Sequence, residues 1–192
     1  MGYAFSKHYY QITDDEIKTI KKETGFSTSQ VKRLFNRFQH IDCDGRGYLL
    51  RSDFENINEV ALNPMGDKLT DLFFPDNATK VHFPEFAKQF AVFRPVKMNT
   101  PGYAVNSRDA KLKFLYSLMD GNKDGKVDRE DVYEVLELMM GAKVDAEQLN
   151  LIAARVIDEA DTNQDGVISI HEFQKITEEL EVGVKMSFIS FR

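Results

Sequence analysis

The chain has 192 residues, of which 42% are hydrophobic and 29% charged, enough material for one or two compact cores. Its formal net charge of −6 argues against nucleic acid as a main partner. A single cysteine, Cys43, rules out an internal disulfide and fits a reducing compartment. We find no secretory signal and no apolar run of about 18 residues, so the sequence predicts no membrane-spanning helix.

Two helices are predicted near the N-terminus, each opened by a capping box. Thr13 followed by Glu16 starts a helix that runs to about Lys22, and Ser27 with Gln30 starts the next. The apolar side chains of the second helix fall on one face: Val31, Leu34, Phe35, Phe38 and Ile41.

Four loops flanked by predicted helices then follow, starting at Asp42, near Phe74, at Asp120 and at Asp161. A twelve-residue calcium loop takes side-chain oxygens at positions 1, 3 and 5, a backbone carbonyl at 7, often a water at 9, and a bidentate glutamate at 12. Position 6 is glycine, which allows a sharp turn. The repeat predicts helix-loop-helix units and very little strand.

The first loop, Asp42–Asp53, keeps acidic side chains at positions 1, 3 and 12 and Gly47 at position 6. It places Arg46 at position 5, where an oxygen is needed. A guanidinium there puts a positive charge where a ligand should be, so we expect this loop to be structural.

The second loop, Phe74–Glu85, has lost its ligands, with Ala78 at position 5, and we expect it to bind no ion. Leu49 and Val81 hold position 8 of the first two loops and are suited to pair them. We therefore expect apolar packing, not ions, to hold the N-terminal half together.

The stretch FRPVKMNTPGYAVNSRD, from Phe93 to Asp109, has two prolines and few apolar residues, which predicts a linker between halves. Ser107 caps the helix that follows, and Asp145 with Gln148 opens a later one. The predicted apolar stripes of the C-terminal helices are Leu112, Leu115 and Met119; Val132, Val135, Leu136 and Met139; Leu149, Ile152 and Val156; and Phe173, Ile176 and Leu180.

The third loop fits the calcium pattern except at its last position. Its residues at positions 1, 3, 5, 6, 7, 9 and 12 are Asp120, Asn122, Asp124, Gly125, Lys126, Asp128 and Asp131. Asp131 is one methylene shorter than glutamate, so contact through both oxygens is harder, whereas Mg²⁺ accepts fewer ligands at shorter distances. We predict that this loop binds an ion with less preference for Ca²⁺ over Mg²⁺ than the fourth loop has.

The fourth loop fills every position of the pattern. Its residues in the same order are Asp161, Asn163, Asp165, Gly166, Val167, Ser169 and Glu172. Ile168 at position 8 is expected to point inward and pair with the neighbouring loop. We predict that this is the more Ca²⁺-selective of two ion sites.

The predicted fold class is all-α, with two EF-hand lobes of paired helix-loop-helix units joined by a central linker. The expected boundaries are 1–24 for an N-terminal segment with a short helix, 25–93 for a pair with degenerate loops, 94–107 for the linker, 108–182 for the ion-binding pair and 183–192 for a tail. Residues 108–181 contain 18 acids and 9 bases, which favours divalent cations in that half. No nucleophile–base pattern or phosphate-binding glycine loop is present, so we expect no enzyme.

Segments outside the ion loops resemble the calcineurin B homologous proteins over nearly the whole chain. They are KKETGFSTSQVKRLFNRF, ALNPMGDKL with the following LFFP, FRP at Phe93 to Pro95, and KMSF near the C-terminus. Two degenerate loops followed by two intact ones also match that family. Calcineurin B, the regulatory subunit of a Ca²⁺-dependent phosphatase, is a less close match here because it carries four intact loops.

The resemblance implies a regulatory subunit without catalysis of its own, which binds an amphipathic juxtamembrane helix of a plasma-membrane Na⁺/H⁺ exchanger. Such proteins support the exchanger's stability, activity and pH response. The resemblance also implies, for some members, inhibition of calcineurin and a part in vesicle traffic. The alternatives are therefore a calcineurin regulatory subunit or inhibitor, with the calcineurin catalytic subunit as partner, and a plain Ca²⁺ buffer.

A helical partner needs an apolar groove on this protein. Helical spacing makes ten residues candidates for its floor, each of which is also a candidate for ordinary core: Leu34, Phe38, Leu72, Phe73, Phe86, Phe90, Leu118, Val135, Met139 and Ile176.

Gly2 and Ser6 satisfy the pattern for N-myristoylation, and members of the resembling family are myristoylated. Tyr3 departs from it, because a bulky aromatic beside the acceptor glycine is disfavoured. One acyl chain anchors only marginally, so membrane residence would need the transporter as well. We expect a cytoplasmic protein that is peripheral at the plasma membrane and at other membranes.

Overall fold

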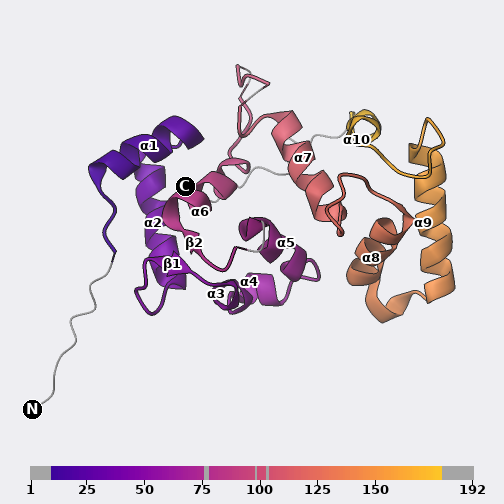
Figure 1. Ribbon diagram of the computed structural model, residues 1–192, viewed down its shortest axis with the longest axis horizontal. Coiled ribbons are helices and arrows are strands. Elements are labelled where there is room, and N and C mark those ends of the chain that lie inside the picture. The colour runs from indigo at the N-terminus through magenta and orange to yellow at the C-terminus, as the bar shows by residue number, and fades with distance from the viewer. Residues whose placement is uncertain (1–9, 76–77, 98, 103, 179–192) are drawn as a thin grey trace, which may run out of the picture.

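The computed structural model describes residues 10–75, 78–97, 99–102 and 104–178. These form two mostly helical lobes, an N-terminal one drawn in indigo to magenta and a C-terminal one drawn in pink to yellow (Figure 1). The all-α prediction is confirmed. In the described ranges, no helix is both long and apolar enough to cross a bilayer.

The N-terminal lobe contains two helix-loop-helix units with a short helix inserted between them. Its elements are α1 (Asp14–Thr24), α2 (Thr28–Ile41), β1 (Tyr48–Leu49), α3 (Arg51–Glu55), α4 (Asn58–Ala61), α5 (Gly66–Phe73), β2 (Val81–His82) and α6 (Phe83–Ala91). The first unit is α2, its loop and α3, and the second is α5, its loop and α6.

The C-terminal lobe repeats this plan, with α8 and α9 longer than their counterparts α3 and α5. Its elements are α7 (Arg108–Met119), α8 (Arg129–Met140), the 3-10 turn η2 (Gly141–Lys143), α9 (Ala146–Ala160) and α10 (Ile170–Ile176). The third loop joins α7 to α8, and the fourth joins α9 to α10.

The helix starts expected from the sequence are confirmed. The backbone amide of Glu16 donates to Thr13 Oγ1 over 3.2 Å, and that of Gln30 donates to Ser27 Oγ over 3.3 Å. Both caps are complete capping boxes, in which the Glu16 or Gln30 side chain accepts from the cap's own backbone amide. These bonds satisfy amides that the first turn of a helix leaves without partners.

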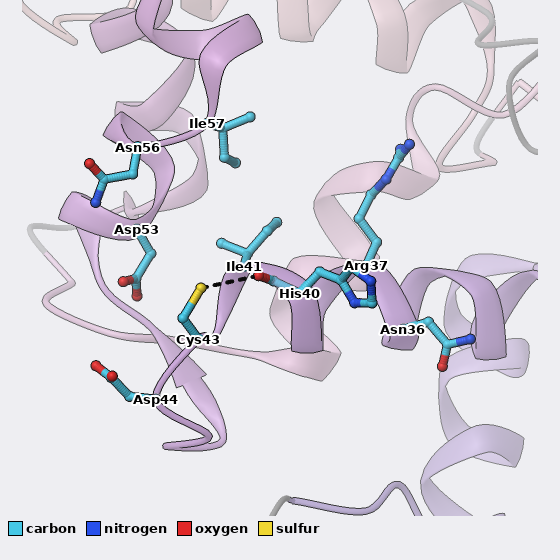
Figure 2. A pocket seen from close by; sticks show the side chains of 9 residues that line it. All are labelled: Asn36, Arg37, His40, Ile41, Cys43, Asp44, Asp53, Asn56 and Ile57. Atoms are coloured by element: carbon cyan, nitrogen blue, oxygen red, sulfur yellow. Dashed lines mark hydrogen bonds between the residues drawn. The ribbon is translucent and has the colours of Figure 1, made fainter.

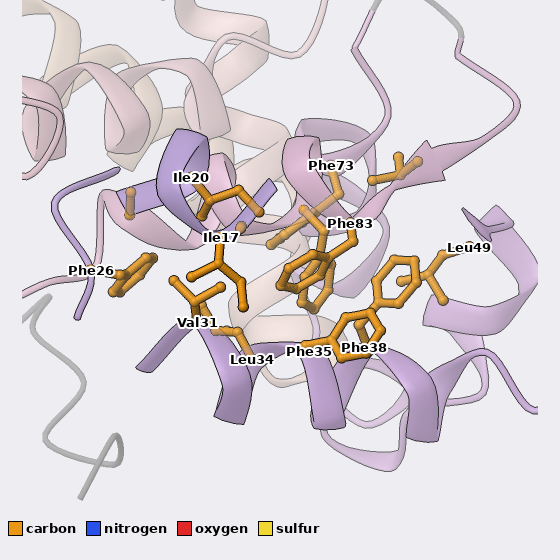
Figure 3. Packing of buried hydrophobic residues seen from close by; sticks show 14 of the residues in the cluster. Ile17, Ile20, Phe26, Val31, Leu34, Phe35, Phe38, Leu49, Phe73 and Phe83 are labelled. Carbon is orange, nitrogen blue, oxygen red and sulfur yellow. The ribbon is translucent and has the colours of Figure 1, made fainter. Parts of the chain in front are cut away.

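Aromatic side chains fill the core of the N-terminal lobe (Figure 3). The Phe83 ring meets Phe35 and Phe38 edge-on, at centroid distances of 5.0 and 5.5 Å. Ile17 and Ile20 of α1 are buried in the same cluster, and α1 packs against α2 and α6. Helix α1 is thus part of this lobe, although it lies in the segment 1–24 that we set apart from the N-terminal pair.

Residues at position 8 pair the loops within each lobe. Leu49 lies opposite Val81 in a two-stranded antiparallel ladder, as expected from their place at position 8. In the C-terminal lobe, the Ile168 amide donates to the Val127 carbonyl over 2.8 Å, and the Ile168 carbonyl accepts from the Val127 amide over 3.2 Å. The predicted pairing of Ile168 with its neighbouring loop is confirmed.

The segment between the lobes makes specific contacts with both. Arg94 donates through Nη1 to the Thr24 carbonyl over 2.7 Å. Lys111, fully buried on α7, donates to the Val92 carbonyl over 2.7 Å, and the Phe93 and Phe114 rings meet at 4.9 Å. Helix α5 also packs against α7, so the lobes contact each other directly as well as through the segment at 94–107.

Candidate metal centres

Three of the four loops share one backbone shape. Positions 4 and 6 have positive φ in the first, third and fourth loops: Gly45 (67°) and Gly47 (80°), Lys123 (59°) and Gly125 (84°), and Gln164 (61°) and Gly166 (88°). Glycine tolerates this region readily, whereas lysine and glutamine do so at a cost. The surrounding hydrogen bonds therefore impose the turn.

The aspartate at position 1 organises each of these turns. Asp161 accepts from the Gln164 amide through Oδ1 and from the Gly166 amide through Oδ2, both over 2.7 Å. Asp120 accepts from the Gly125 amide over 2.9 Å. Both aspartates are buried, so the loop amides replace the water that their carboxylates would otherwise bind.

Glu172 closes the fourth loop at position 12. It accepts from the Ser169 amide over 2.9 Å and the Ser169 hydroxyl over 2.7 Å, and from the Thr162 hydroxyl over 2.9 Å. These donors, led by the Ser169 amide, lower the pKa of Glu172 to about 2. The carboxylate is therefore ionised at neutral pH, as a metal ligand must be.

Asp131 closes the third loop with fewer partners. Its Oδ1 accepts from the Gly121 amide over 2.9 Å, and its Oδ2 from the Asp128 amide over 3.1 Å. Position 2 is Gly121 here and Thr162 in the fourth loop, so the hydroxyl contact of the fourth loop has no counterpart. Sequence reasoning missed Thr162, because the twelve-residue pattern gives position 2 no role.

The acidic side chains of the third loop affect the pKa of Tyr116. Its hydroxyl donates to the Ile168 carbonyl over 2.7 Å, beneath the paired loops. Burial, and then the negative charges of Asp120, Asp124 and Asp131, raise the pKa of Tyr116 to about 12. This loop therefore carries a concentrated negative potential suited to a cation.

The donor sets of the two C-terminal loops fit a hard divalent cation, which takes about six to eight oxygens when it is Ca²⁺. The third loop offers side-chain oxygens of Asp120, Asn122, Asp124, Asp128 and Asp131 and the Lys126 carbonyl. The fourth offers side-chain oxygens of Asp161, Asn163, Asp165, Ser169 and Glu172 and the Val167 carbonyl.

These oxygens hold backbone amides rather than converge on one point. Across residues 10–75, 78–97, 99–102 and 104–178, no three Asp, Glu, His or Cys side chains gather closely enough to hold a metal. Ion coordination by these twelve residues therefore remains a prediction.

In the first loop, the Arg46 side chain contacts three acidic side chains of the same loop. Arg46 donates through Nη2 to Asp53 over 2.5 Å, and its Nε and Nη1 lie 3.5 and 3.6 Å from carboxylate oxygens of Asp42 and Asp44. The hydrogen bond to Asp53 raises the pKa of Arg46. Arg46 therefore places its positive charge among the carboxylates of the loop, as its position 5 indicated, and the expectation that the loop binds no ion stays a prediction.

Two of these carboxylates, Asp44 and Asp53, border a pocket of about 630 Å³ between α2 and α3 (Figure 2). Asp44 and Asp53 lie on its loop side, and Arg37 and His40 on its α2 side. Cys43 donates through Sγ to the His40 carbonyl over 3.4 Å.

The second loop has no acidic side chain at positions 1 and 5, which are Phe74 and Ala78. Phe74 at position 1 is buried in the core, where a ligand would face an ion. The Lys80 ammonium lies 4.2 Å from the centre of the Tyr48 ring in the first loop. This loop is therefore joined to the first loop by a cation–aromatic contact and a strand pair.

Comparison with known proteins agrees with this architecture. Residues 103–178 match the model of an EF-hand domain pair. Calcineurin B of Candida glabrata is 31% identical over 171 residues, which cover 89% of this chain and 93% of that protein. The chain therefore belongs to the calcineurin B-like family of EF-hand proteins.

Two further relatives of this calcineurin B-like protein have similar coverage. Calcineurin B of Naegleria gruberi is 30% identical over 173 residues, covering 90% of this chain and 93% of that one. Calcineurin B type 1 of Dictyostelium discoideum is 30% identical over 162 residues, covering 84% and 85%. Family membership supports a Ca²⁺-binding regulatory role and is consistent with a protein that is not an enzyme.

The structure divides the ten groove candidates of this calcineurin B-like protein into three groups. Leu34, Phe38, Phe73 and Phe86 are core residues with 1%, 1%, 7% and 0% of their surface exposed, so placing them on a groove floor was wrong. Each lies on the helix face that packs against the other helices of its own lobe. Leu72, Phe90, Leu118 and Val135 are half-buried.

Met139 and Ile176 are the exposed candidates, at 66% and 48%. Other large apolar side chains of the C-terminal lobe are exposed too: Leu138, Met140, Leu151 and Ile152. Sequence reasoning missed these four as surface positions, because a helical stripe does not say which of its neighbours another helix covers. Gly2 lies outside the described residues.

Proposed function

We propose that this protein is a Ca²⁺-binding regulatory subunit whose C-terminal lobe takes an amphipathic helix of a partner protein. The observation that carries the proposal is the exposure of large apolar side chains on α8, α9 and α10, which include Met139, Leu151 and Ile176. Large apolar side chains left exposed on three helices of one lobe are available to contact another chain. The two predicted ion loops lie in the same lobe.

Two kinds of partner helix are candidates for this surface. An exchanger's juxtamembrane helix is supported by the segments KKETGFSTSQVKRLFNRF and ALNPMGDKL and by the first loop, where Arg46 replaces a ligand. A helix of the calcineurin catalytic subunit is supported at least as well, since the three relatives named above are calcineurin B proteins matched over most of their length.

A competition experiment discriminates between the partners. The full chain is titrated by calorimetry with a synthetic exchanger juxtamembrane helix and with the calcineurin catalytic chain's own regulatory-subunit-binding helix, each in Ca²⁺ and in chelator. An exchanger regulator binds the first peptide more tightly, and a calcineurin regulator or inhibitor binds the second. A plain Ca²⁺ buffer binds neither, and that result would overturn the proposal.

Variants locate the surface. We expect Met139→Glu to weaken the preferred peptide by more than about tenfold, because it places a charge in an apolar contact. Leu62→Glu is the matched control, because Leu62 is 84% exposed in the N-terminal lobe. Equal loss of binding in both variants would contradict a site on the C-terminal lobe. Circular dichroism confirms that each variant remains helical.

Membrane association is part of the same proposal and rests on Gly2. We propose that Gly2 is myristoylated and that the acyl chain acts together with a membrane-bound partner, because one chain anchors only marginally. Intact-mass measurement of protein made in eukaryotic cells should show one added myristoyl group, which Gly2→Ala removes. If the wild-type protein has its unmodified mass, the proposed myristoylation of Gly2 is overturned.

A further inference from the structure

Lys68 and Glu134 form a salt bridge between the two lobes. Lys68 Nζ on α5 donates to Glu134 Oε2 on α8 over 3.0 Å, and the Lys68 side chain is only 16% exposed. No other salt bridge in the described part of the chain joins an N-terminal element to a C-terminal one. Glu134 lies on α8, the helix that begins at the end of the third loop.

The Lys68 ammonium lies against the third loop itself. A Cβ atom placed on Gly121, at position 2, would lie 2.9 Å from Lys68 Nζ, 3.0 Å from Glu134 Oε2 and 3.3 Å from Asp131 Oδ1. Three charged groups therefore meet over a glycine, and one of them is the predicted ligand at position 12. Any side chain at Gly121 would push them apart.

The fourth loop has a different neighbour at the same place. Its position 2 is Thr162, whose hydroxyl donates to Glu172 over 2.9 Å. The third loop has at this point a positive charge supplied by the other lobe, and the fourth has a neutral hydroxyl of its own. Sequence spacing has no signal for this difference, because Lys68 and Glu134 are 66 residues apart.

We propose that Lys68 sets the ion affinity of the third loop and couples that loop to the contact between the lobes. A fixed positive charge beside a site repels an incoming divalent cation. Coupling is reciprocal, so an ion in the third loop weakens the Lys68–Glu134 contact by the same free energy. The inference rests on the proposed ion binding by the third loop, and it adds a residue from outside that loop.

Calorimetric Ca²⁺ titration of three full-length variants tests the charge effect. Lys68→Gln leaves Glu134 without its cation, so the affinity of the third loop should rise by about three- to tenfold. Glu134→Gln leaves Lys68 without its anion, so that affinity should fall. Lys88→Gln is the matched control and should change neither loop, because Lys88 pairs with Glu23 inside the N-terminal lobe.

The opposite signs separate this proposal from a purely structural role, which would weaken binding in both variants. The two loops are assigned with Asp120→Ala and Glu172→Gln, which remove a predicted ligand from the third and the fourth loop. If Asp120→Ala binds as many ions as the wild type, the third loop is no ion site, and the present inference falls together with the predicted ion binding of that loop, whereas the proposed peptide binding is tested separately. If Asp120→Ala loses one ion but Lys68→Gln binds as the wild type does, only the present inference is overturned.

A second readout follows the contact itself. Acetylation by a water-soluble succinimidyl ester is measured at Lys68 and at Lys88 by mass spectrometry. Ca²⁺ should speed the reaction of Lys68 relative to Lys88 in the wild type but not in Asp120→Ala. A Lys68 rate that does not respond to Ca²⁺ in the wild type would overturn the coupling.

Discussion

The Arg46 guanidinium and the Asp53 carboxylate close the first loop across 2.5 Å. Asp53 holds position 12, where a calcium loop carries its bidentate ligand, and Arg46 holds position 5. The loop thus keeps the backbone turn of an ion site and balances its carboxylates with a cation from its own chain. All of these contacts come from residues of the loop itself.

Arg46→Asp should turn this loop into an ion site. The variant has carboxylates at positions 1, 3, 5 and 12, and calorimetry should find one more Ca²⁺ per chain than in the wild type. In chelator the unbalanced carboxylates should lower the free energy of unfolding by about 1–2 kcal/mol. Arg33→Asp, on the exposed side of α2, makes the same charge change as a control. Equal stoichiometry in both variants would show that the loop does not accept an ion.

Asp131→Glu should make the third loop more like the fourth. The added methylene restores the reach of a bidentate ligand, so the ratio of Ca²⁺ to Mg²⁺ affinity should rise by about tenfold. Asp109→Glu, exposed in the first turn of α7, adds the same methylene away from the loop. The idea fails if the wild-type third loop already binds Ca²⁺ more tightly and more selectively than the fourth.

Lys111 should make stability depend on pH in the alkaline range. Burial lowers the pKa of Lys111 from 10.5 to about 8, so the unfolded chain holds this proton more tightly than the folded one. Stability therefore rises with pH between about 8 and 10.5. Urea unfolding at pH 7 and pH 10 should show this rise in the wild type and a smaller one in Lys111→Met. If stability rises equally in both proteins, titratable groups other than Lys111 cause the pH dependence.

Gly25→Ala should destabilise the N-terminal lobe by about 1–2 kcal/mol. Gly25 ends α1 with a φ of 68°, and a Cβ there would collide with Arg94 Nη1, which bonds to the Thr24 carbonyl. Gly102→Ala is the control, because no atom of the described residues, its chain neighbours aside, lies within 4 Å of its added Cβ. Thermal unfolding compares the two, and equal midpoints would mean that Arg94 moves aside without cost.

Local patterns account for what could be predicted. The caps at Thr13 and Ser27 and the pairing of Leu49 with Val81 depend on side chains a fixed number of residues apart. The role of Arg46 could be predicted for the same reason, since its partners lie within its own loop. Helix α4 had no individual signal in the sequence, because its four residues are too few to show an apolar stripe.

By itself, the sequence determined the all-α fold class, the four loops and the chemical character of each. Only the tertiary structure decided that Leu34, Phe38, Phe73 and Phe86 are core while Met139 and Ile176 are exposed. It alone brought Lys68 to Glu134 and Gly121. The physical reason is that a cap or a loop is formed by neighbours along the chain, whereas burial and contacts between lobes depend on how distant helices pack.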